Sequence, residues 1–391
     1  MMPLPNPAVD TDFIKPRLRV FLSVDLIGST QFKMAQANSG PGHHSLDEKS
    51  WWPNVLMEFY TDFQKKFLDN WAEWTRLASG WDEIVIGPAP KLWKALGDEL
   101  IFSKTCLHVN EVWGLVQVWR KTIIDFKATW NYDQLKFKSG AWLVGSPVRN
   151  WEIAFLREPA SADEIALMDD QFAYNFHLLS QYYDEANTRK IHLDFIGPSM
   201  DCGFRLLAKA DERKFILSAD LVFLLRRSQK ACEMKFSGTA YPPLRYYFDG
   251  VSELKGIARY GVAYPLFWLD AFALETESDV AKYARSIDRL SDVEPIKVEK
   301  LDAFLMTYLD EMTGFPEPPY IEGPAEANGN RDSYCPEDHQ DQIAKLRSAY
   351  LSSLDRIEGI RNSAMLDEAD GAEPTSLQTS AIEGLLLKLD E

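Results

Sequence analysis

One stretch near the N-terminus constrains the fold of this chain most: residues 19–30, with the sequence RVFLSVDLIGST. Its apolar residues first alternate and then run on, which is typical of a buried central strand. Gly28 permits a tight turn, and the Ser29 that follows is a good helix N-cap. The stretch therefore predicts a strand, a turn and the start of a helix, with Asp25 close to the junction.

The junction has the residue types of a phosphate and metal site. Free backbone N–H groups at such a turn bind anions, and a carboxylate just before the turn can hold a divalent cation. Metal-dependent chemistry on a nucleoside triphosphate requires both. Strand–Asp–Gly turns are also common, so an alternative is that Asp25 only caps the following helix.

A second stretch, residues 92–102, reads LWKALGDELIF. Two short apolar runs flank a Gly-Asp pair, which predicts a hairpin with Asp98 at its tip. A Gly-Asp pair is common in turns and does not by itself indicate a metal site. If the hairpin lies beside the first strand, however, Asp25 and Asp98 converge and can bridge two metal ions roughly 3.5–4 Å apart.

These two stretches resemble the metal-binding motifs of class III nucleotidyl cyclases. Residues 194–205, DFIGPSMDCGFR, resemble the family's Asp-x-x-Gly-x-x-x-Asn-x-x-x-Arg helix. Residues 254–256, LKG, followed by 261–266, GVAYPL, resemble its closing Lys-Gly hairpin. The resemblance covers residues 16 to about 270. Large insertions and an acidic C-terminal extension narrow it to the bacterial anti-phage Pycsar cyclases, which make cyclic UMP or cyclic CMP.

The resemblance implies an α+β fold: an α/β sandwich whose mostly antiparallel central sheet is flanked by helices, with a C-terminal helical extension. The predicted order of strands and helices fits this class. Residues 1–16 are expected to be a flexible arm and residues 17–270 the catalytic domain, with insertions at about 38–90 and 157–190. Residues 271–391 are expected to be acidic and mainly helical, with a linker at 314–340.

The family pattern also implies roles for the residues of the first two stretches. Asp25, Leu26 and Asp98 would hold two divalent cations, Mn²⁺ or Mg²⁺. Backbone groups at Gly28 and Ser29 would bind the phosphates of the substrate.

Three further residues match the helix and the closing hairpin. Arg205 would stabilise charge in the transition state; its alternative role is an ion pair with Asp201 one turn earlier, worth only about 0.5 kcal/mol. Asp201 stands where the family usually has an asparagine near the ribose, and an ionised carboxylate cannot donate a hydrogen bond. Lys255 is a candidate phosphate ligand that also reads as an exposed surface lysine.

Lys94 and Asp194 occupy the family's base-reading positions. In the family these residues come from the subunit opposite the metal aspartates, which implies a homodimer with shared active sites. A lysine donor and a carboxylate acceptor suit adenine and cytosine as well as uracil. A pyrimidine therefore requires a pocket too short for a purine. Four aromatic residues are candidates for that restriction: Trp51, Trp52, Trp93 and Phe195.

The expected reaction follows from the resemblance. The ribose 3′-hydroxyl of UTP would attack the α-phosphate with the help of two metals, giving 3′,5′-cyclic UMP and pyrophosphate. Cyclic UMP would act as an anti-phage second messenger read by a separate effector protein. The alternatives are a cytidylate cyclase, an adenylyl cyclase, and a non-catalytic nucleotide-binding scaffold.

Composition limits the partners and the compartment. The net charge of −17 over 391 residues disfavours a nucleic-acid polymer or an anionic membrane as partner, because both need a basic surface. No apolar run reaches the roughly 20 residues that span a bilayer. The four cysteines are scattered without a CxxC pair, which indicates reduced thiols and a cytoplasmic protein.

Overall fold

The computed structural model describes most of the chain, in two compact units. The larger unit comprises Pro16–Trp151 and Phe195–Pro336, and the smaller unit comprises Met1–Lys15, Glu152–Asp194 and Glu337–Glu391. The described residues are 10–37, 51–156, 170–184, 190–257, 263–271, 283, 286–287, 294–311, 319–321 and 335–369.

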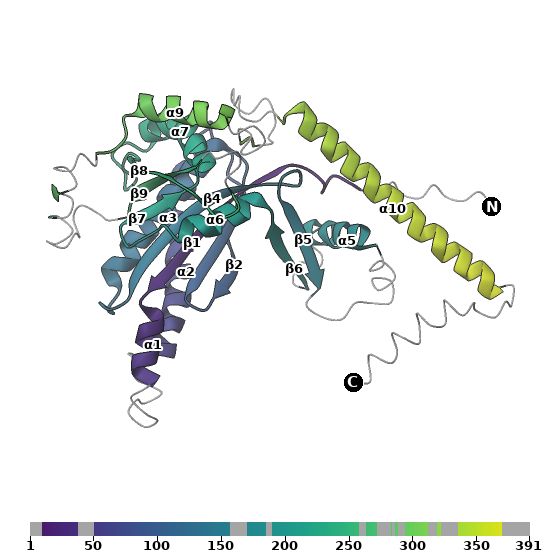
Figure 1. Cartoon of the computed structure of the whole chain (residues 1–391), viewed down its shortest axis with the longest axis horizontal. Helices are drawn as coiled ribbons and strands as arrows, with labels where there is room; N and C mark the ends of the chain where they lie inside the picture. The colour runs from purple at the N-terminus through teal and green to yellow at the C-terminus, as the bar shows by residue number, and fades with distance from the viewer. Residues whose placement is uncertain are drawn as a thin grey trace. The chain divides into compact units, whose positions relative to one another are not determined.

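A seven-stranded sheet forms the centre of the larger unit, in the order β2-β3-β1-β4-β7-β9-β8 (Figure 1). Every neighbouring pair is antiparallel except β4 and β7, which are parallel. The strands are β1 (Arg17–Ile27), β2 (Lys91–Leu96), β3 (Glu99–Cys106), β4 (Lys136–Ser146), β7 (Lys214–Leu217), β8 (Tyr246–Ser252) and β9 (Tyr264–Asp270).

The long strand β1 lies between β3 and β4, and its alternating side chains build two different faces. Val20, Leu22 and Val24 belong to the main hydrophobic core. Because successive side chains of a strand point to opposite faces, Phe21 and Asp25 lie on the other face of the sheet. The hydrophobic run of the sequence thus fixes the face on which the carboxylate of Asp25 lies.

Helices cover both faces of this sheet. The core-side layer has α2 and α3 packed together, and α3 packed on α7, while α6 packs on β4 from the opposite face. On α2, aromatic rings recur at every fourth residue from Phe59 to Trp71 and are buried, so they form the core face of this helix. The helices of the larger unit are α1 (Ser29–Ala37), α2 (Trp52–Ala78), α3 (Val109–Thr129), α6 (Pro198–Leu207), α7 (Ala219–Lys235) and α9 (Val298–Glu311).

Helix α6 lies unusually close to the sheet. A Cβ atom added to Gly203 would lie 2.3 Å from the indole ring of Trp142 on β4. Any side chain at this position would therefore push the helix away from the sheet. Gly203 sets the distance between β4 and the helix that carries Asp201 and Arg205.

The smaller unit contains the helices α5 (Gln171–Tyr183) and α10 (Glu337–Ala369), which contact each other. The short strands β5 (Trp151–Leu156) and β6 (Ile191–Ile196) form a separate two-stranded sheet. Phe13 was expected in a flexible arm, but it is buried because its ring packs against Phe176 and Tyr350. The beginning of the predicted 157–190 insertion lies outside the described residues.

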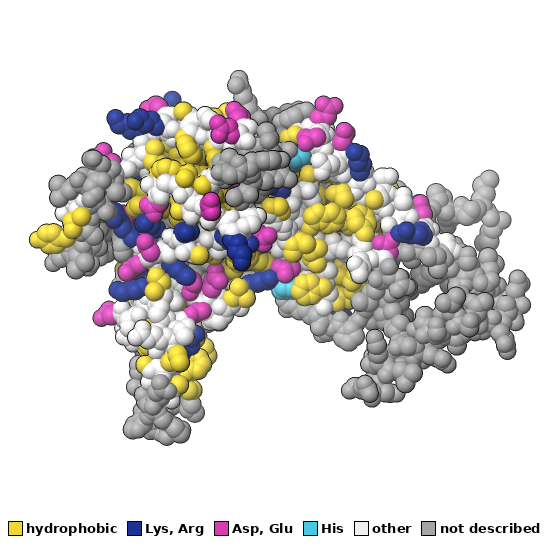
Figure 2. Space-filling view, viewed as in Figure 1, with side chains coloured by type: hydrophobic (Ala, Val, Ile, Leu, Met, Phe, Trp, Pro, Cys, Tyr) yellow, Lys and Arg dark blue, Asp and Glu magenta, His cyan; other side chains and the backbone are white. Residues whose placement is uncertain are grey.

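The predicted α+β fold with a mostly antiparallel sheet flanked by helices is confirmed. None of the helices that the structure describes has the length and apolar character needed to cross a membrane. On the face seen in Figure 2, lysine and arginine side chains are interspersed with acidic ones.

Candidate active site

The end of β1 and the turn between β2 and β3 meet in the structure. The Leu26 backbone N–H donates a hydrogen bond to the Asp98 carbonyl, with an N···O distance of 3.1 Å. The Ser29 hydroxyl donates to the Asp98 carboxylate. The first and second sequence motifs therefore lie side by side, as the metal-site hypothesis requires, and Asp25 directly precedes one of the residues in contact.

The turn after β1 can be made only by glycine. Gly28 has a φ angle of +88°, and an added Cβ would lie 2.9 Å from the carbonyl oxygen of Gln134. Its own carbonyl accepts a hydrogen bond from Phe32 in the first turn of α1. The N-terminus of α1 thus begins next to the two aspartates, where its free N–H groups favour an anion.

Two lysines pair with the two aspartates, and the sequence motifs included neither of them. Lys138 lies directly across from Asp25 on β4, and its Nζ is 2.8 Å from an oxygen of the Asp25 carboxylate. Lys33, on α1, has its Nζ 4.0 Å from the Asp98 carboxylate. The site therefore holds cations of its own. Lys138 could be found only from the strand register, which the sequence does not show.

A third carboxylate, that of Glu99, completes the acidic side of the site. Glu99 lies directly across from Asp25 on β3 and accepts a 2.6 Å hydrogen bond from the Ser23 hydroxyl. Burial raises the pKa of Glu99; the hydrogen bond from Ser23 lowers it, and the negative charges of Asp25 and Asp98 raise it further. Glu99 is thus a half-buried acid held beside the two predicted metal ligands.

The donor set suits a metal ion that arrives with its substrate. Among the described residues, no group of three or more His, Cys, Asp or Glu side chains is arranged to hold a metal ion. Mg²⁺ commonly uses one or two protein carboxylates and takes its remaining ligands from substrate phosphates and water. Asp25, Asp98 and the Leu26 carbonyl supply hard oxygen donors beside a helix N-terminus, so they fit such an ion.

Arg205 and the turn containing Lys255 form a second group. Arg205 donates a 3.0 Å hydrogen bond to the backbone carbonyl of Asp201, while its nearest contact with the Asp201 carboxylate is 3.9 Å. An added Cβ on Gly256 would lie 3.8 Å from a guanidinium nitrogen of Arg205. Asp201 is 68% exposed, so the ion pair between the two side chains is weak.

A buried asparagine positions the start of α6, and the sequence motifs did not include it. Gly197 has a φ of +136° and no side chain to cap the helix. Asn150, which follows β4 and is fully buried, accepts a 2.9 Å hydrogen bond from the Ser199 N–H instead. Its amide also donates 2.9 Å to the Gly145 carbonyl and 3.1 Å to the Ser199 hydroxyl.

The two predicted base-reading residues fall in different units. Lys94 lies on β2 in the larger unit, with its Nζ 4.3 Å from the ring centroid of Trp93. Asp194 lies on β6 in the smaller unit. A role for Asp194 in reading the base stays a prediction.

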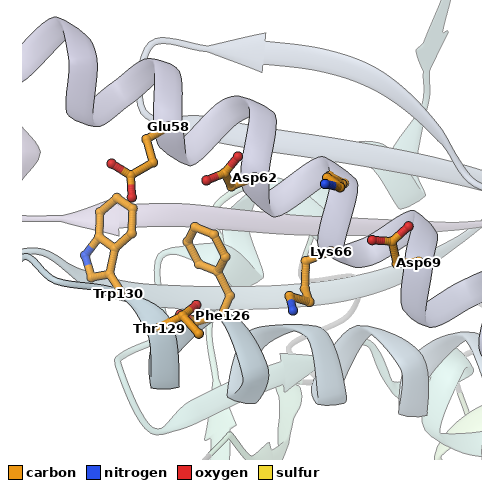
Figure 3. A pocket seen from close by; sticks show the side chains of 8 residues that line it. Glu58, Asp62, Lys66, Asp69, Phe126, Thr129 and Trp130 are labelled. Atoms are coloured by element: carbon orange, nitrogen blue, oxygen red, sulfur yellow. The ribbon is translucent and has the colours of Figure 1, made fainter. Parts of the chain in front are cut away.

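A pocket of about 340 Å³ lies elsewhere, between α2 and α3 (Figure 3). Glu58, Asp62 and Asp69 line it together with two lysines of α2. Phe126 and Thr129 of α3, with Trp130 directly after the helix, form the other side. None of the predicted site residues lines this pocket.

No protein-family model matches the chain, and no curated protein matches its sequence. Among solved structures, the adenylyl cyclase CyaB from P. aeruginosa is similar, at 11% identity over 68% of this chain and 97% of that one, with a TM-score of 0.33. The guanylyl cyclase Cya2 is similar at 10% identity over 68% and 96%, with a TM-score of 0.32. The guanylate cyclase domain of RhGC from Catenaria anguillulae, in complex with GTP, is similar at 10% over 65% and 97%, with a TM-score of 0.30. Identities and TM-scores at this level establish no shared activity.

Proposed function

We propose that this protein is a metal-dependent nucleotidyl cyclase that converts UTP to 3′,5′-cyclic UMP and pyrophosphate. The observation that carries the proposal is the contact of Asp98 with Leu26 and Ser29, which lies beside Asp25 at the start of α1. Ser29 and Asp98, which are 69 positions apart in the chain, thus belong to one cluster with the composition that a metal-bound triphosphate needs.

The chain's own residues would bind and orient the nucleotide. Asp25, Leu26 and Asp98 would hold Mg²⁺ or Mn²⁺, which when bound neutralises phosphate charge and lowers the pKa of the attacking hydroxyl. The backbone at Gly28 and Ser29 would receive the phosphates at the N-terminus of α1. Holding the 3′-hydroxyl in line with the α-phosphate supplies most of the remaining acceleration.

Cations in the site would offset the negative charge of the whole protein. Lys138 contacts the Asp25 carboxylate and Lys33 contacts the Asp98 carboxylate. With metal ions bound to these carboxylates, both lysines would face the triphosphate. Arg205 would stabilise charge that develops in the transition state, with Lys255 as a second phosphate ligand on the adjacent turn. Asp201 lies on the exposed face of α6 one turn earlier and would accept a hydrogen bond from the ribose.

The assembly and the biological role extend this proposal. Lys94 and Asp194 would read the base in a homodimer whose active sites are shared across the interface. The product would be a second messenger in anti-phage defence, made in the cytoplasm and read by a separate effector protein. The resemblance of the four sequence motifs to class III nucleotidyl cyclases supports the shared-site homodimer. The large insertions and the acidic C-terminal extension, which narrow the resemblance to Pycsar cyclases, support the role in anti-phage defence.

The test is incubation of the pure protein with each of the four ribonucleoside triphosphates and Mn²⁺, with products resolved by mass spectrometry. We expect cyclic UMP from the wild type and none from Asp98→Ala. Cyclic CMP or cyclic AMP would change the assigned base and keep the cyclase. If none of the four triphosphates gives a cyclic product, the catalytic proposal fails, and nucleotide binding then tests the scaffold alternative.

A further inference from the structure

The strand that carries Lys94 is interrupted by a β-bulge at Trp93. Leu92 pairs with Phe102 on β3 and Lys94 pairs with the neighbouring residue Ile101, so the register shifts by one residue at Trp93. A bulge of this kind breaks the alternation of side chains and redirects one of them. The side chains of Trp93 and Lys94, which regular alternation would place on opposite faces of the sheet, consequently lie together.

The contacts of Trp93 show which face of the sheet it reaches. Its indole packs edge-on against Phe21, at a centroid distance of 5.2 Å, and against Phe195, at 5.5 Å. A looser contact joins it to Phe204 on α6, at 6.5 Å. Phe21 and Phe195 are both buried, so they form a rigid support behind the half-buried indole.

The ammonium of Lys94 lies over this indole, at 4.3 Å from the ring centroid. Such a cation–π contact contributes about 0.5–1 kcal/mol at a partly exposed site and restricts where the lysine can point. A base that accepts a hydrogen bond from Lys94 at about 2.9 Å must come within about 7 Å of the Trp93 ring centre. The bulky indole of Trp93 therefore lies beside any base that Lys94 binds.

We propose that Trp93 determines the size of the accepted base: its indole occupies space that the second ring of a purine would need, so that a single-ring base remains. This inference rests on the proposed function, because it takes Lys94 as a base ligand. It selects Trp93 from the four aromatic candidates, and it gives a steric reason for pyrimidine nucleotides as the substrate class.

The structure also separates Trp93 from the other three aromatic candidates. Trp52 packs against the main core from α2, and its ring lies 6.5 Å from that of Trp51. Phe195 is buried behind the indole of Trp93. Of the four, Trp93 is the one that combines partial exposure with a contact to Lys94.

Binding of non-reactive nucleotides tests the inference without requiring turnover. Titration calorimetry with 3′-deoxy-UTP and 3′-deoxy-ATP, which lack the attacking hydroxyl, gives the ratio of the two dissociation constants. We expect Trp93→Ala to lower the preference for the pyrimidine at least about tenfold, because steric exclusion of the larger ring is lost. Trp93→Phe should lie between Trp93→Ala and the wild type.

Two further variants keep the result interpretable. Trp93→Leu still covers Phe21 and Phe195, so it guards against loss of folding in Trp93→Ala and should show the same loss of preference. Trp81→Ala removes a half-buried indole that packs edge-on against Phe236, outside this cluster, and should leave the ratio unchanged.

The two proposals fail in distinguishable ways. A folded Trp93→Leu that keeps the wild-type ratio overturns the role of Trp93, even if the wild type makes cyclic UMP. A wild type that binds neither 3′-deoxy nucleotide overturns the proposed function itself.

Discussion

Asp25 is paired on both sides within the sheet, and its two neighbours carry opposite charges. Lys138 on β4 contacts its carboxylate at 2.8 Å, while Glu99 on β3 lies directly across from it. A metal ion at Asp25 must therefore compete with an ammonium group that is already in place. Both carboxylates named by the sequence motifs have such a lysine, because Lys33 stands 4.0 Å from Asp98.

This competition predicts the effect of removing one lysine. Lys138→Met deletes the ammonium but keeps most of the side-chain volume, so Mn²⁺ should bind more tightly in the absence of nucleotide. A partly exposed ion pair is worth about 0.2–1 kcal/mol, which corresponds to a gain of up to about fivefold in affinity. Electron paramagnetic resonance of free Mn²⁺ measures that affinity directly.

The same variant should weaken binding of the triphosphate, since Lys138 is then missing as a phosphate cation. Lys136→Met is the matched control, because Lys136 lies on the same strand and its nearest carboxylate is that of Glu212, at 3.8 Å. Equal Mn²⁺ affinities for Lys138→Met and the wild type would contradict the competition.

At the scale of elements, α6 is fixed to the sheet at two points. Gly203 permits the close approach to Trp142, and Asn150 supplies the cap that Gly197 cannot. Both points come from β4 or from the turn that follows it. The position of Arg205 is thus set by a strand more than 50 residues earlier in the chain.

Asn150→Ala tests this arrangement. The change leaves the buried Ser199 N–H without its acceptor, while the Gly145 carbonyl loses the side-chain donor but keeps the Asn150 backbone N–H at 3.2 Å. The loss of the buried acceptor should lower the free energy of unfolding by about 1–3 kcal/mol. Cyclase activity should fall as well, because α6 carries Arg205. Denaturant unfolding and a turnover assay measure the two effects.

Asn150→Asp keeps the acceptor for the Ser199 N–H and loses the donor to Gly145, so it should lie between the alanine variant and the wild type. If Asn150→Ala unfolds at the same denaturant concentration as the wild type, the cap is not what holds α6.

The sequence was sufficient for some of these elements and not for others. Local patterns of apolar residues and glycine predict a strand–turn–helix at residues 19–30 and a hairpin at residues 92–102. Both elements are present in the structure. Lys138, Glu99 and Asn150 act through strand register or through a turn distant in the chain, and no local pattern reports these relations. The bulge at Trp93 was missed for the same reason, because a bulge exists only relative to its partner strand.

In the smaller unit, too, the sequence does not show which segments pack together. Phe13, Phe176 and Tyr350 come from three separate parts of the chain, and their rings pack together. The sequence divides these parts among an arm, an insertion and a C-terminal extension. Composition marks the C-terminal extension as acidic, but it does not show that the three segments share one core.

For the whole molecule, the sharpest prediction concerns the assembly. Lys94 and Asp98 are four residues apart on one hairpin, yet the proposed homodimer uses them in different active sites. A heterodimer of Lys94→Ala and Asp98→Ala subunits, purified through two different tags, would then contain one site with both defects and one intact site. It should recover about half of the wild-type activity per dimer, although each variant alone is inactive.

A heterodimer of Asp25→Ala and Asp98→Ala is the matched control. Asp25 and Asp98 lie together within one subunit, so each site of this heterodimer lacks one metal ligand and should remain inactive. Recovery in the first heterodimer together with none in the second requires that Lys94 acts across the interface. If the first heterodimer also stays inactive while homodimers of the wild type turn over, Lys94 serves the same site as its own Asp98, and the shared-site arrangement is wrong.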